Sequence, residues 1–405
     1  MTRQLRVGIV GGGIGGLALA ASLAKFGVEA RVFERASAFG ETGAGIQMTP
    51  NAVRILRDLG LWQQLRRVSF LPRCIVGRNW RSGNEIFRTP LIDECPKLYG
   101  TEFFHSHRAD VHRILLSLLP DNAGVLGAHC VSVAQTRTGA AIRFADGSEY
   151  EADLVVGADG IHSVVRRSLF GDDAPRFTGK MCWRTVVAFD EQPLDLVSPD
   201  ASFWLGPHGH VVTYYVRGGS MVNVVAIRDS SEWTEESWNV PSTPEEMMDG
   251  FPGWHPNILS LFAKSTDVFK WGLFDRDPMA AWSSGRITLL GDAAHPMLPF
   301  LSQGAAMAIE DGYVLARVLA NEGHLAKALR DYEALRLPRT RRVQLESRKR
   351  GHTYHTVSPV RQICRDAVYK IRQLIEPHSS GLQASWVYAY DAVSLPLNTP
   401  ARRTA

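Results

Sequence analysis

The N-terminal stretch Leu5-Arg-Val-Gly-Ile-Val-Gly-Gly-Gly-Ile-Gly-Gly-Leu17 decides the fold of this chain. Its first half, Leu5 to Val10, is a short apolar run that predicts a buried strand. The small residues 17–24 after the glycines predict a helix. The glycines between them have the Gly-x-Gly-x-x-Gly spacing of dinucleotide-binding turns. A strand, a glycine turn and a helix in this order predict the start of a βαβ unit.

The glycines and the acid after the second strand have separate physical roles. Gly11 allows the tight turn, Gly13 lets a pyrophosphate approach backbone N–H groups, and Gly16 lets the helix pack closely on its strand. The N-terminus of that helix then faces the phosphates. The second strand runs from Glu29 to Glu34, whose carboxylate can accept hydrogen bonds from a ribose. We therefore predict dinucleotide binding, with a glycine-rich packing contact as the alternative.

Two further turns combine glycine with aspartate after strand-like segments. Val155 leads into Gly157-Ala-Asp-Gly160, and the buried-strand pattern Arg286–Leu290 leads into Gly291-Asp-Ala-Ala-His-Pro296. Asp292 in the second turn follows a strand and precedes a helix, which is where ligands bind in α/β sheets. We predict that Asp292 contacts the dinucleotide, with capping of the local backbone as the alternative.

The middle of the chain changes from alternating strands and helices to strands alone. Strand-like segments occupy 183–189, 201–205, 210–216 and 222–227, and no crossover helix separates the last three. This pattern predicts an antiparallel sheet inserted into the nucleotide domain. The expected fold class is therefore α/β, a Rossmann-like dinucleotide-binding domain interrupted by an antiparallel-sheet substrate domain, with a helical C-terminal part.

The predicted domain boundaries follow these changes along the chain. The nucleotide domain is expected at 1–75, 100–175 and 275–325, the substrate domain at 76–99 and 176–274, and the C-terminal helical segment at 326–405. Only one Gly-x-Gly-x-x-Gly follows a strand, so one dinucleotide is expected to be held firmly. Any second dinucleotide would bind only transiently.

The composition argues against several classes of protein. With 45 Lys and Arg against 41 Asp and Glu, the net charge is only +4, and no basic cluster indicates a nucleic-acid partner. The five cysteines lie far apart without a C-x-x-C pair, which fits a reducing, cytoplasmic compartment. The longest apolar runs are shorter than the roughly 18 residues of a membrane span. The pairs His105/His107 and His208/His210 lack a third ligand, so no metal is predicted.

Taken in order, the three glycine and acid motifs resemble those of the single-component, FAD-dependent aromatic hydroxylases of the p-hydroxybenzoate hydroxylase fold. The resemblance covers nearly the whole chain. It is closer to the group of salicylate hydroxylase, 3-hydroxybenzoate 6-hydroxylase and 6-hydroxynicotinate 3-monooxygenase. The segments that support this group are Phe33-Glu-Arg35, Gly43-Ala-Gly45, His107-Arg-Ala-Asp110, Gln303-Gly-Ala305 and Trp386-Val-Tyr-Ala-Tyr-Asp391.

The resemblance implies a non-covalently bound FAD and a set of residues around its adenosine and phosphates. Glu34 and Arg35 would hold the ribose, and Val131 would offer its backbone to the adenine. Arg108 would reach the pyrophosphate or ribityl chain, and Asp159 would lie near the phosphates and the approach of NADH or NADPH. The turn at the pyrophosphate would comprise Gly13, Ile14 and Gly15.

At the flavin end, the resemblance implies that Asp292 binds a ribityl hydroxyl. Gly45, Ile46 and Gln47 would form a backbone-permissive loop, with Gln47 at the boundary between flavin and substrate. A long helix is expected from near Ser302, and Gly304 and Ala305 in its first turn would leave N–H groups free. The positive end of the helix dipole would stabilise the negative charge of reduced flavin.

The chemistry that the resemblance implies needs a base beside the substrate. In this family NADH or NADPH reduces FAD, O₂ adds to form a C4a-hydroperoxide, and its distal oxygen attacks an electron-rich ring. Histidine suits removal of a phenolic proton near neutral pH. His210, Val212 and Tyr214 share one face of a predicted strand, and the Cα atoms of His210 and Tyr214 are about 13 Å apart. The resemblance assigns the base to His210 and a substrate hydrogen bond to Tyr214, with structural packing as the alternative for each.

The predicted function is hydroxylation of a hydroxylated aromatic or pyridine carboxylic acid, with FAD, NADH or NADPH, and O₂. Decarboxylative hydroxylation, as with salicylate or 6-hydroxynicotinate, is slightly preferred over plain hydroxylation of the 3-hydroxybenzoate type. A non-catalytic binding protein of the same fold is the remote alternative. The residues leave open the choice between NADH and NADPH and the choice between a monomer and a homodimer.

Overall fold

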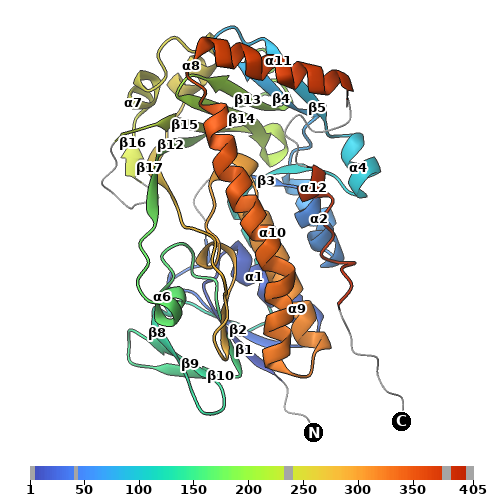
Figure 1. Ribbon diagram of the computed structural model, residues 1–405, viewed down its shortest axis with the longest axis vertical. Coiled ribbons are helices and arrows are strands. Elements are labelled where there is room, and N and C mark those ends of the chain that lie inside the picture. The colour runs from blue at the N-terminus through green and yellow to red at the C-terminus, as the bar shows by residue number, and fades with distance from the viewer. Residues whose placement is uncertain (1–4, 41–43, 232–239, 376–384, 398–405) are drawn as a thin grey trace.

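The computed structural model describes residues 5–40, 44–231, 240–375 and 385–397. A five-stranded parallel sheet forms the lower part of the molecule in Figure 1, in the order β18-β11-β1-β2-β7. Its strands are β1 (Arg6–Val10), β2 (Glu29–Phe33), β7 (Gly124–Val125), β11 (Leu154–Gly157) and β18 (Ile287–Leu289). The carboxyl ends of β1, β11 and β18 therefore meet at one edge, which places the three glycine and acid turns together.

Helices that are rich in small residues pack beside this sheet. Helix α1 (Ile14–Lys25) lies against α9 (Gly304–Asn321) and α5 (Arg108–Leu116). The approach of α1 and α9 is close, because a Cβ atom at Gly312 would lie 2.7 Å from the backbone nitrogen of Leu19. The remaining helices of this part are α2 (Pro50–Asp58), α3 (Trp62–Val68), α4 (Glu94–Tyr99) and α6 (Val164–Phe170).

Two small antiparallel sheets accompany the parallel one. One consists of β8 (Cys130–Gln135), β9 (Ala140–Phe144) and β10 (Glu149–Ala152), and the other pairs β3 (Gly45–Met48) with β6 (Phe104–His107). Gly45, Ile46 and Gln47, which were expected to form a loop, thus belong to β3, and β6 leads directly into α5.

An eight-stranded sheet forms the upper part of the molecule, in the order β16-β17-β12-β15-β14-β13-β4-β5. Neighbouring strands are antiparallel except β13 and β4, which pair in parallel. Its strands are β4 (Cys74–Asn79), β5 (Glu85–Pro90), β12 (Arg176–Ala188), β13 (Ala201–Gly206), β14 (Gly209–Val216), β15 (Met221–Asp229), β16 (Val240–Ser242) and β17 (Val268–Asp275). The antiparallel sheet predicted in the middle of the chain is confirmed.

Both faces of this sheet are covered, and its central strands β13, β14 and β15 are almost continuously buried. On one face Val211, Tyr215 and Val224 pack against α7 (Pro244–Asp249) and α8 (Pro256–Ala263). On the other face Val212 and Tyr214 belong to a cluster with Phe300 and Tyr354. This second face looks toward the parallel sheet and carries the residues predicted to contact substrate.

C-terminal helices connect the two parts of the molecule. Helix α10 (Leu325–Tyr354) packs on α9 at one end and reaches the eight-stranded sheet at the other (Figure 1). Helix α11 (Pro359–Ile375) then packs on β5, and α12 (Ser385–Tyr388) lies near α2. The α/β class with an interrupting antiparallel sheet and a helical C-terminal part is thereby confirmed. Within the described residues, no helix is long and apolar enough to cross a membrane.

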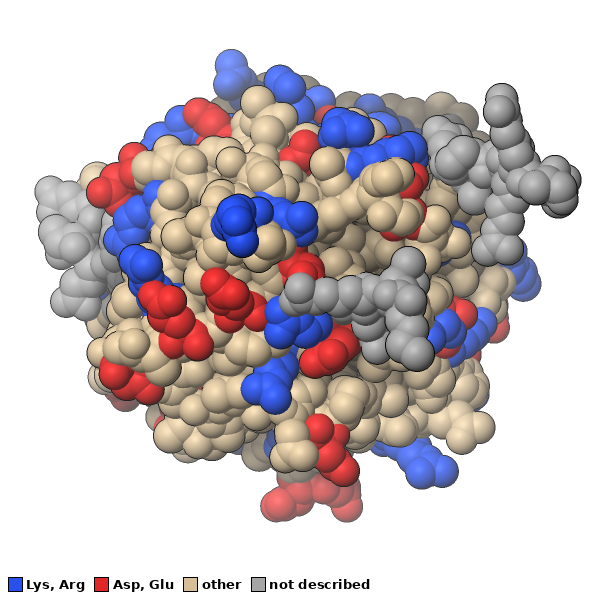
Figure 2. All heavy atoms as spheres, turned by 90° about the horizontal axis from the view of Figure 1, so that it is seen from below, with Lys and Arg blue, Asp and Glu red and all other residues tan. Residues whose placement is uncertain are grey.

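Charged side chains of both signs share the surface. Figure 2 shows Lys and Arg interspersed with Asp and Glu on the face seen from below. Many of them pair locally, as Arg143 does with Glu149 across a hairpin and Lys327 with Asp331 one helical turn away. On this face, charge alone therefore marks no ligand site.

Candidate active site

A cavity of about 680 Å³ extends from the glycine turn after β1 to the inner face of the eight-stranded sheet. Almost every predicted cofactor residue lines it: Gly13, Ile14, Gly15, Glu34, Arg35, Gly45, Ile46, Gln47, Arg108, Asp159, Asp292, Gly304 and Ala305. Both predicted substrate residues, His210 and Tyr214, line its far end. One continuous space therefore joins the two predicted sites.

The glycine turn has the geometry that a pyrophosphate needs. Gly11 has a φ of 107°, and a Cβ atom at Gly16 would collide with the Gly11 carbonyl, so neither position tolerates a side chain. Helix α1 begins at Ile14 with Gly13 as N-cap, and no side chain caps it. The first N–H groups of α1 therefore point without side-chain partners toward the cavity.

Glu34 is held in position to accept hydrogen bonds from a ribose. Its Oε2 atom accepts from Gly12 N at 2.8 Å, and its Oε1 atom accepts from Ala36 N at 2.9 Å. Each carboxylate oxygen keeps a further lone pair. This acceptor at the end of β2, together with the uncapped N-terminus of α1, fits the adenosine diphosphate half of FAD.

Val131 does not line the cavity. It lies on β8 with 49% of its surface exposed, whereas its neighbours Ala128, His129 and Cys130 line the cavity wall. The strand places Cys130 inward and Val131 outward, because successive side chains on a strand point to opposite faces.

The two aspartates of the later turns have different environments. Asp159 caps helix α6: its Oδ2 atom accepts from Val164 N at 2.8 Å, and its Oδ1 atom accepts from the Ser163 hydroxyl. Burial raises the pKa of Asp159, and these hydrogen bonds partly offset that rise. Asp159 thus organises the turn that lines the cavity.

Asp292 follows β18 (Ile287–Leu289) directly and is open to the cavity. The surrounding protein raises the pKa of its carboxyl by desolvation, while His295 and Arg108 favour the charged form. Asp292 is therefore a hydrogen-bond acceptor that is open to the cavity and lies near His295 and Arg108. This position fits the expected contact with a ribityl hydroxyl.

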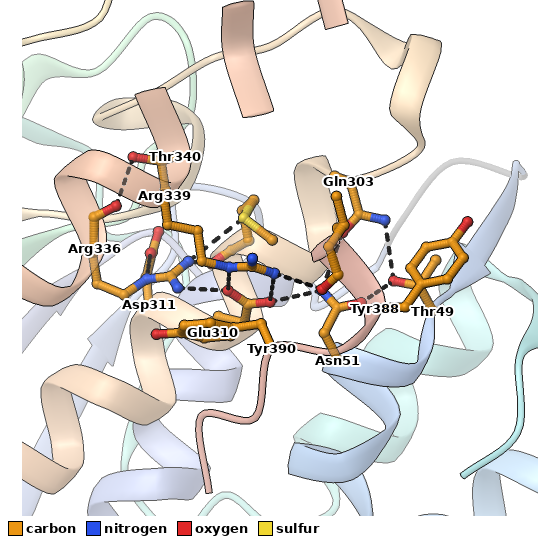
Figure 3. Close-up of polar contacts among 12 residues, drawn as sticks. Thr49, Asn51, Gln303, Glu310, Asp311, Arg336, Arg339, Thr340, Tyr388 and Tyr390 are labelled. Atoms are coloured by element: carbon orange, nitrogen blue, oxygen red, sulfur yellow. Dashed lines mark hydrogen bonds and ion pairs between the residues drawn. The ribbon is translucent and has the colours of Figure 1, made fainter. Parts of the chain in front are cut away.

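The N-terminus of α9 lies beside Asp292 and is fixed by a buried polar network (Figure 3). Gln303 donates to the Thr49 hydroxyl at 3.1 Å and accepts from the Asn51 amide at 3.1 Å. Asn51 also donates to Glu310, which pairs with Arg336 and Arg339. No side chain caps this helix, so its first N–H groups remain available to a flavin edge.

The expected helix starts slightly later than predicted. Ser302 has a φ of 53°, which is the left-handed region, and α9 begins at Gly304. The left-handed residue turns the chain from the short 3₁₀ turn Pro299–Leu301 into the helix. This turn brings Pro299 and Phe300 to the cavity wall beside Gly304.

The start of β3 is joined to the substrate sheet by a side chain that sequence reasoning missed. Gly45 N donates to Asn223 Oδ1 at 2.6 Å, and a Cβ atom at Gly45 would lie 2.5 Å from the Asn223 Cγ atom. Gln47, two residues on, is buried, and its Nε2 atom has no hydrogen-bond partner among the described residues. A donor without a partner in the cavity wall fits a contact to a bound ligand.

His210 and Tyr214 lie on the same face of β14, as predicted, and both are buried. The ring of His105 packs 4.3 Å from the ring of Tyr214. Burial raises the pKa of Tyr214, so its hydroxyl stays protonated and can donate. Burial lowers the pKa of His210 well below its usual value, and His355 and Lys180 lower it further. His210 is therefore neutral near pH 7 and can accept a proton.

Arg184 on β12 is a cavity residue that sequence reasoning missed. In the strand register Arg184 lies opposite Val225 on β15, and Val225 lies opposite Val212 on β14. Val212 is midway between His210 and Tyr214 on that strand. The guanidinium lies 5.3 Å from the centre of the Trp271 ring and has no carboxylate partner among the described residues. The alternation of side chains along the strand could have indicated its inward direction, because Arg184 lies two residues from the buried Cys182 and shares its face.

The paired histidines show no metal-binding arrangement. Both ring nitrogens of His105 are buried without hydrogen-bond partners, and no group of three or more His, Cys, Asp or Glu side chains in the described part of the chain is arranged to hold a metal ion. His208 instead lies 3.7 Å from Asp229.

Comparisons with known proteins agree with this geometry. Residues 4–347 match the model of the FAD binding domain family. A 3-amino-4-hydroxybenzoate 2-monooxygenase of Streptomyces platensis is 44% identical over 392 residues, covering 96% of this chain and 97% of that one. A 6-hydroxynicotinate 3-monooxygenase of Pseudomonas fluorescens is 35% identical over 412 residues, covering both chains fully.

Solved structures share the whole architecture. A salicylate hydroxylase substrate complex is 29% identical, with a TM-score of 0.77 over 96% of this chain and 99% of that one. A Klebsiella pneumoniae protein complexed with FAD and uric acid has a TM-score of 0.84 at 24% identity, which shows the shared fold. The family match and the glycine turn, Glu34 and Asp292 lining one cavity lead to the same conclusion. The chain belongs to the FAD-binding family of flavin-dependent aromatic monooxygenases, with FAD as its cofactor.

Proposed function

We propose that this protein hydroxylates a benzoic or pyridinecarboxylic acid whose ring carries an electron-donating hydroxyl or amino group. The observation that carries the proposal is the common wall formed by His210, Tyr214 and Arg184 at the far end of the FAD cavity. These three side chains supply a base, a hydrogen-bond donor and a cation on one sheet face. The rest of that wall is apolar and includes Phe203, Val212 and Trp271.

Arg184 supplies the specificity for an acid. It lies two strands from β14, which is about 10 Å at the usual strand spacing. A benzoate bridges such a separation with its carboxylate at one end and its ring substituent at the other. A guanidinium whose Nε atom has no hydrogen-bond partner among the described residues is suited to bind the carboxylate of a ligand.

His210 and Tyr214 prepare the ring for attack. His210 is neutral at pH 7 because burial, His355 and the cation of Lys180 lower its pKa, so it can take the proton of a ring hydroxyl. The resulting phenolate oxygen, or the lone pair that a neutral amino group already carries, raises the electron density of the ring at positions ortho and para to it. Tyr214 stays protonated and donates a hydrogen bond that orients the substrate.

The bound FAD supplies the oxidative chemistry, with NADH or NADPH as reductant and O₂ as the source of the inserted oxygen. The protein contributes the electrostatic environment. The N-terminus of α9, held by Gln303 and Asn51, presents its positive dipole end to the cavity at Gly304. When FAD is bound, this end would stabilise negative charge on the reduced flavin.

The names of the relatives bear on the position of attack. Position 2 of 3-amino-4-hydroxybenzoate carries hydrogen and lies ortho to the amino group, so hydroxylation there retains the carboxylate. Position 3 of 6-hydroxynicotinate carries the carboxylate, so oxygen entry there releases CO₂. We favour retention of the carboxylate, because the first relative is 44% identical and the second 35%. Decarboxylative hydroxylation is the second candidate.

A panel of substrates tests the proposal. The FAD-loaded protein is assayed for substrate-stimulated NADH and NADPH oxidation with 3-amino-4-hydroxybenzoate, 6-hydroxynicotinate, 3-hydroxybenzoate and salicylate, and products are identified by chromatography. The matched control is 2-aminophenol, which is the first compound without its carboxylate. We expect a hydroxylated product from at least one acid and a much lower kcat/KM for 2-aminophenol. Equal use of the neutral compound would argue against an acid substrate.

A further inference from the structure

A chain of hydrogen bonds runs from His210 away from the cavity. His210 Nδ1 lies 2.8 Å from His355 Nε2, and His355 Nδ1 lies 2.6 Å from Asp229 Oδ1. Lys180 donates to the same Asp229 oxygen at 3.0 Å. The four residues come from different elements: β14, the end of α10, β15 and β12. A role of His210 as base does not by itself explain why His355, Asp229 and Lys180 are linked to it.

Asp229 determines the direction of every bond in this chain. Burial raises the pKa of Asp229, but hydrogen bonds and charge from His355 and Lys180 outweigh it, so the pKa is lowered and the carboxylate is ionised. An ionised carboxylate only accepts, so His355 donates from Nδ1. Neutral His355 then accepts at Nε2, and His210 donates from Nδ1. The remaining nitrogen of His210, Nε2, is left unprotonated.

The free nitrogen of His210 belongs to the wall of the cavity. His210 lines the cavity, and its Nε2 atom has no hydrogen-bond partner among the described residues. The rings of Phe300 and Tyr354 pack on His210 with centroids 5.4 and 5.2 Å away. The packing and the bond to His355 together hold the imidazole in one orientation, with its basic nitrogen toward the space for substrate.

Exposure rises along the chain from cavity to surface. His210 is 2% exposed and His355 is 4% exposed, whereas the side chain of Asp229 is 31% exposed. Asp229 therefore contacts solvent at the end of the chain. His210 and His355 are almost completely shielded from solvent.

We propose that His210, His355 and Asp229 form a proton relay that carries the proton of the substrate's ring substituent from the cavity to solvent. The proposal rests on the proposed function. The O–H bond of the substrate's ring hydroxyl breaks as the proton binds His210 Nε2. The Nδ1 proton of His210 passes to His355 Nε2, and the Nδ1 proton of His355 passes to Asp229 Oδ1. Asp229 releases that proton to water, and the relay involves no oxidation or reduction.

The charges around the relay explain why His210 needs it. A positive charge confined to His210 would be buried near the cation of Lys180, and both effects disfavour it. On His355 the same charge lies against the carboxylate of Asp229. The other titratable groups that face the relay are His208, 3.7 Å from Asp229, and His352 on α10, which lowers the pKa of His355.

The central test compares H355Q with the unaltered holoenzyme. Glutamine can still accept a hydrogen bond from His210 Nδ1, but it cannot take and pass on a proton. We expect single-turnover hydroxylation at pH 7 to slow by about tenfold or more, a smaller effect than the roughly 10²–10⁴ that a general base contributes. The rate should recover as pH rises toward 9, because hydroxide removes the proton directly. The control variant H324Q changes an exposed histidine at the other end of α10 and should keep the original pH profile.

Two readouts separate a relay from a structural role. FAD content and substrate Kd should be unchanged in H355Q. A stopped-flow pH indicator should show that the substrate's proton reaches the medium more slowly when an acid substrate binds, and this measurement needs no turnover. A rate that is low at every pH, or proton release as fast as in the unaltered protein, would overturn the relay.

Failure of the relay and failure of the proposed function give different results. If H355Q is unaffected while H210Q is strongly impaired, His210 is a base without this relay. If neither variant changes hydroxylation, the role of His210 in the proposed function also falls. If H355Q and D229N both slow proton release and recover at alkaline pH, the relay is supported.

Discussion

The Nδ1 atom of His210 lies 2.8 Å from the Nε2 atom of His355, although 145 positions separate them in the chain. His355 follows α10, the helix that connects the parallel sheet to the eight-stranded sheet. The proposed base of the active site is therefore oriented by the C-terminal region. This contact ties the chemistry at the substrate sheet to the packing of a 30-residue helix.

Asp292 should contribute to FAD retention. In D292N the side chain keeps its size but loses its charge and one acceptor, so a ribityl hydroxyl is held less well. We expect a weaker Kd for FAD, measured by the change in flavin fluorescence on titration of the apoprotein. The control is D172N, whose carboxylate is 90% exposed. An FAD affinity in D292N equal to that of D172N would remove Asp292 from the cofactor site.

Arg184 should determine the preference for acids. Removing one partner of a buried, hydrogen-bonded charge pair costs about 2 kcal/mol or more, so R184M should lose at least roughly 30-fold in kcat/KM for the acid substrate. The kcat/KM for 2-aminophenol should stay the same, because that compound has no carboxylate. If both compounds lose equally, Arg184 supports the sheet instead of binding the carboxylate.

The buried ion network in Figure 3 should contribute strongly to stability. Arg336 is fully buried and donates to Glu310 at 2.5 Å and to Asp311 at 2.7 Å. R336M leaves two buried carboxylates with fewer partners, which should lower the free energy of unfolding by about 3–5 kcal/mol. Urea unfolding monitored by circular dichroism measures this, with R341M on the exposed side of α10 as control. A loss equal to that of R341M would contradict the assignment.

Stability should fall in acid partly through His105. Burial lowers the pKa of His105 from 6.5 to about 3, so between these values the unfolded chain binds more protons than the folded one. The stabilisation is fully present above pH 6.5 and decreases as pH falls toward 3. In H105Q the free energy of unfolding should depend less on pH between 6.5 and 4, whereas H324Q at the exposed start of α10 should keep the original slope. An unchanged slope in H105Q would contradict this.

Local sequence patterns predict much of the cofactor half. The turn at Gly11, the acid at Glu34 and the strand before Asp292 each depend on residues that are adjacent in the chain. Parallel strand pairing then brings their ends together. The backbone contact expected of Val131 stays a prediction, since its side chain points outward and its neighbour Cys130 lines the cavity.

The substrate half could be predicted only where it lies within one strand. His210 and Tyr214 share β14, so alternation places them together. Arg184 reaches the same wall through two strand pairings, and His355 contacts His210 from the end of a helix. The position of His355 depends on long-range packing, for which a single sequence has no local signal. Arg184 was nonetheless visible as a charge on the inward face of a strand.

The most direct test of the central claim is mass spectrometry of products formed under ¹⁸O₂. Purified, FAD-loaded protein is turned over with NADH or NADPH and with 3-amino-4-hydroxybenzoate, 6-hydroxynicotinate, 3-hydroxybenzoate or salicylate. We predict one ¹⁸O atom in the product of at least one acid. Retention of the carboxyl carbon would match the favoured reaction, and its loss as CO₂ would match the second candidate. No labelled product from any of these acids, with NADH or NADPH consumed only to form hydrogen peroxide, would contradict hydroxylation of an aromatic acid.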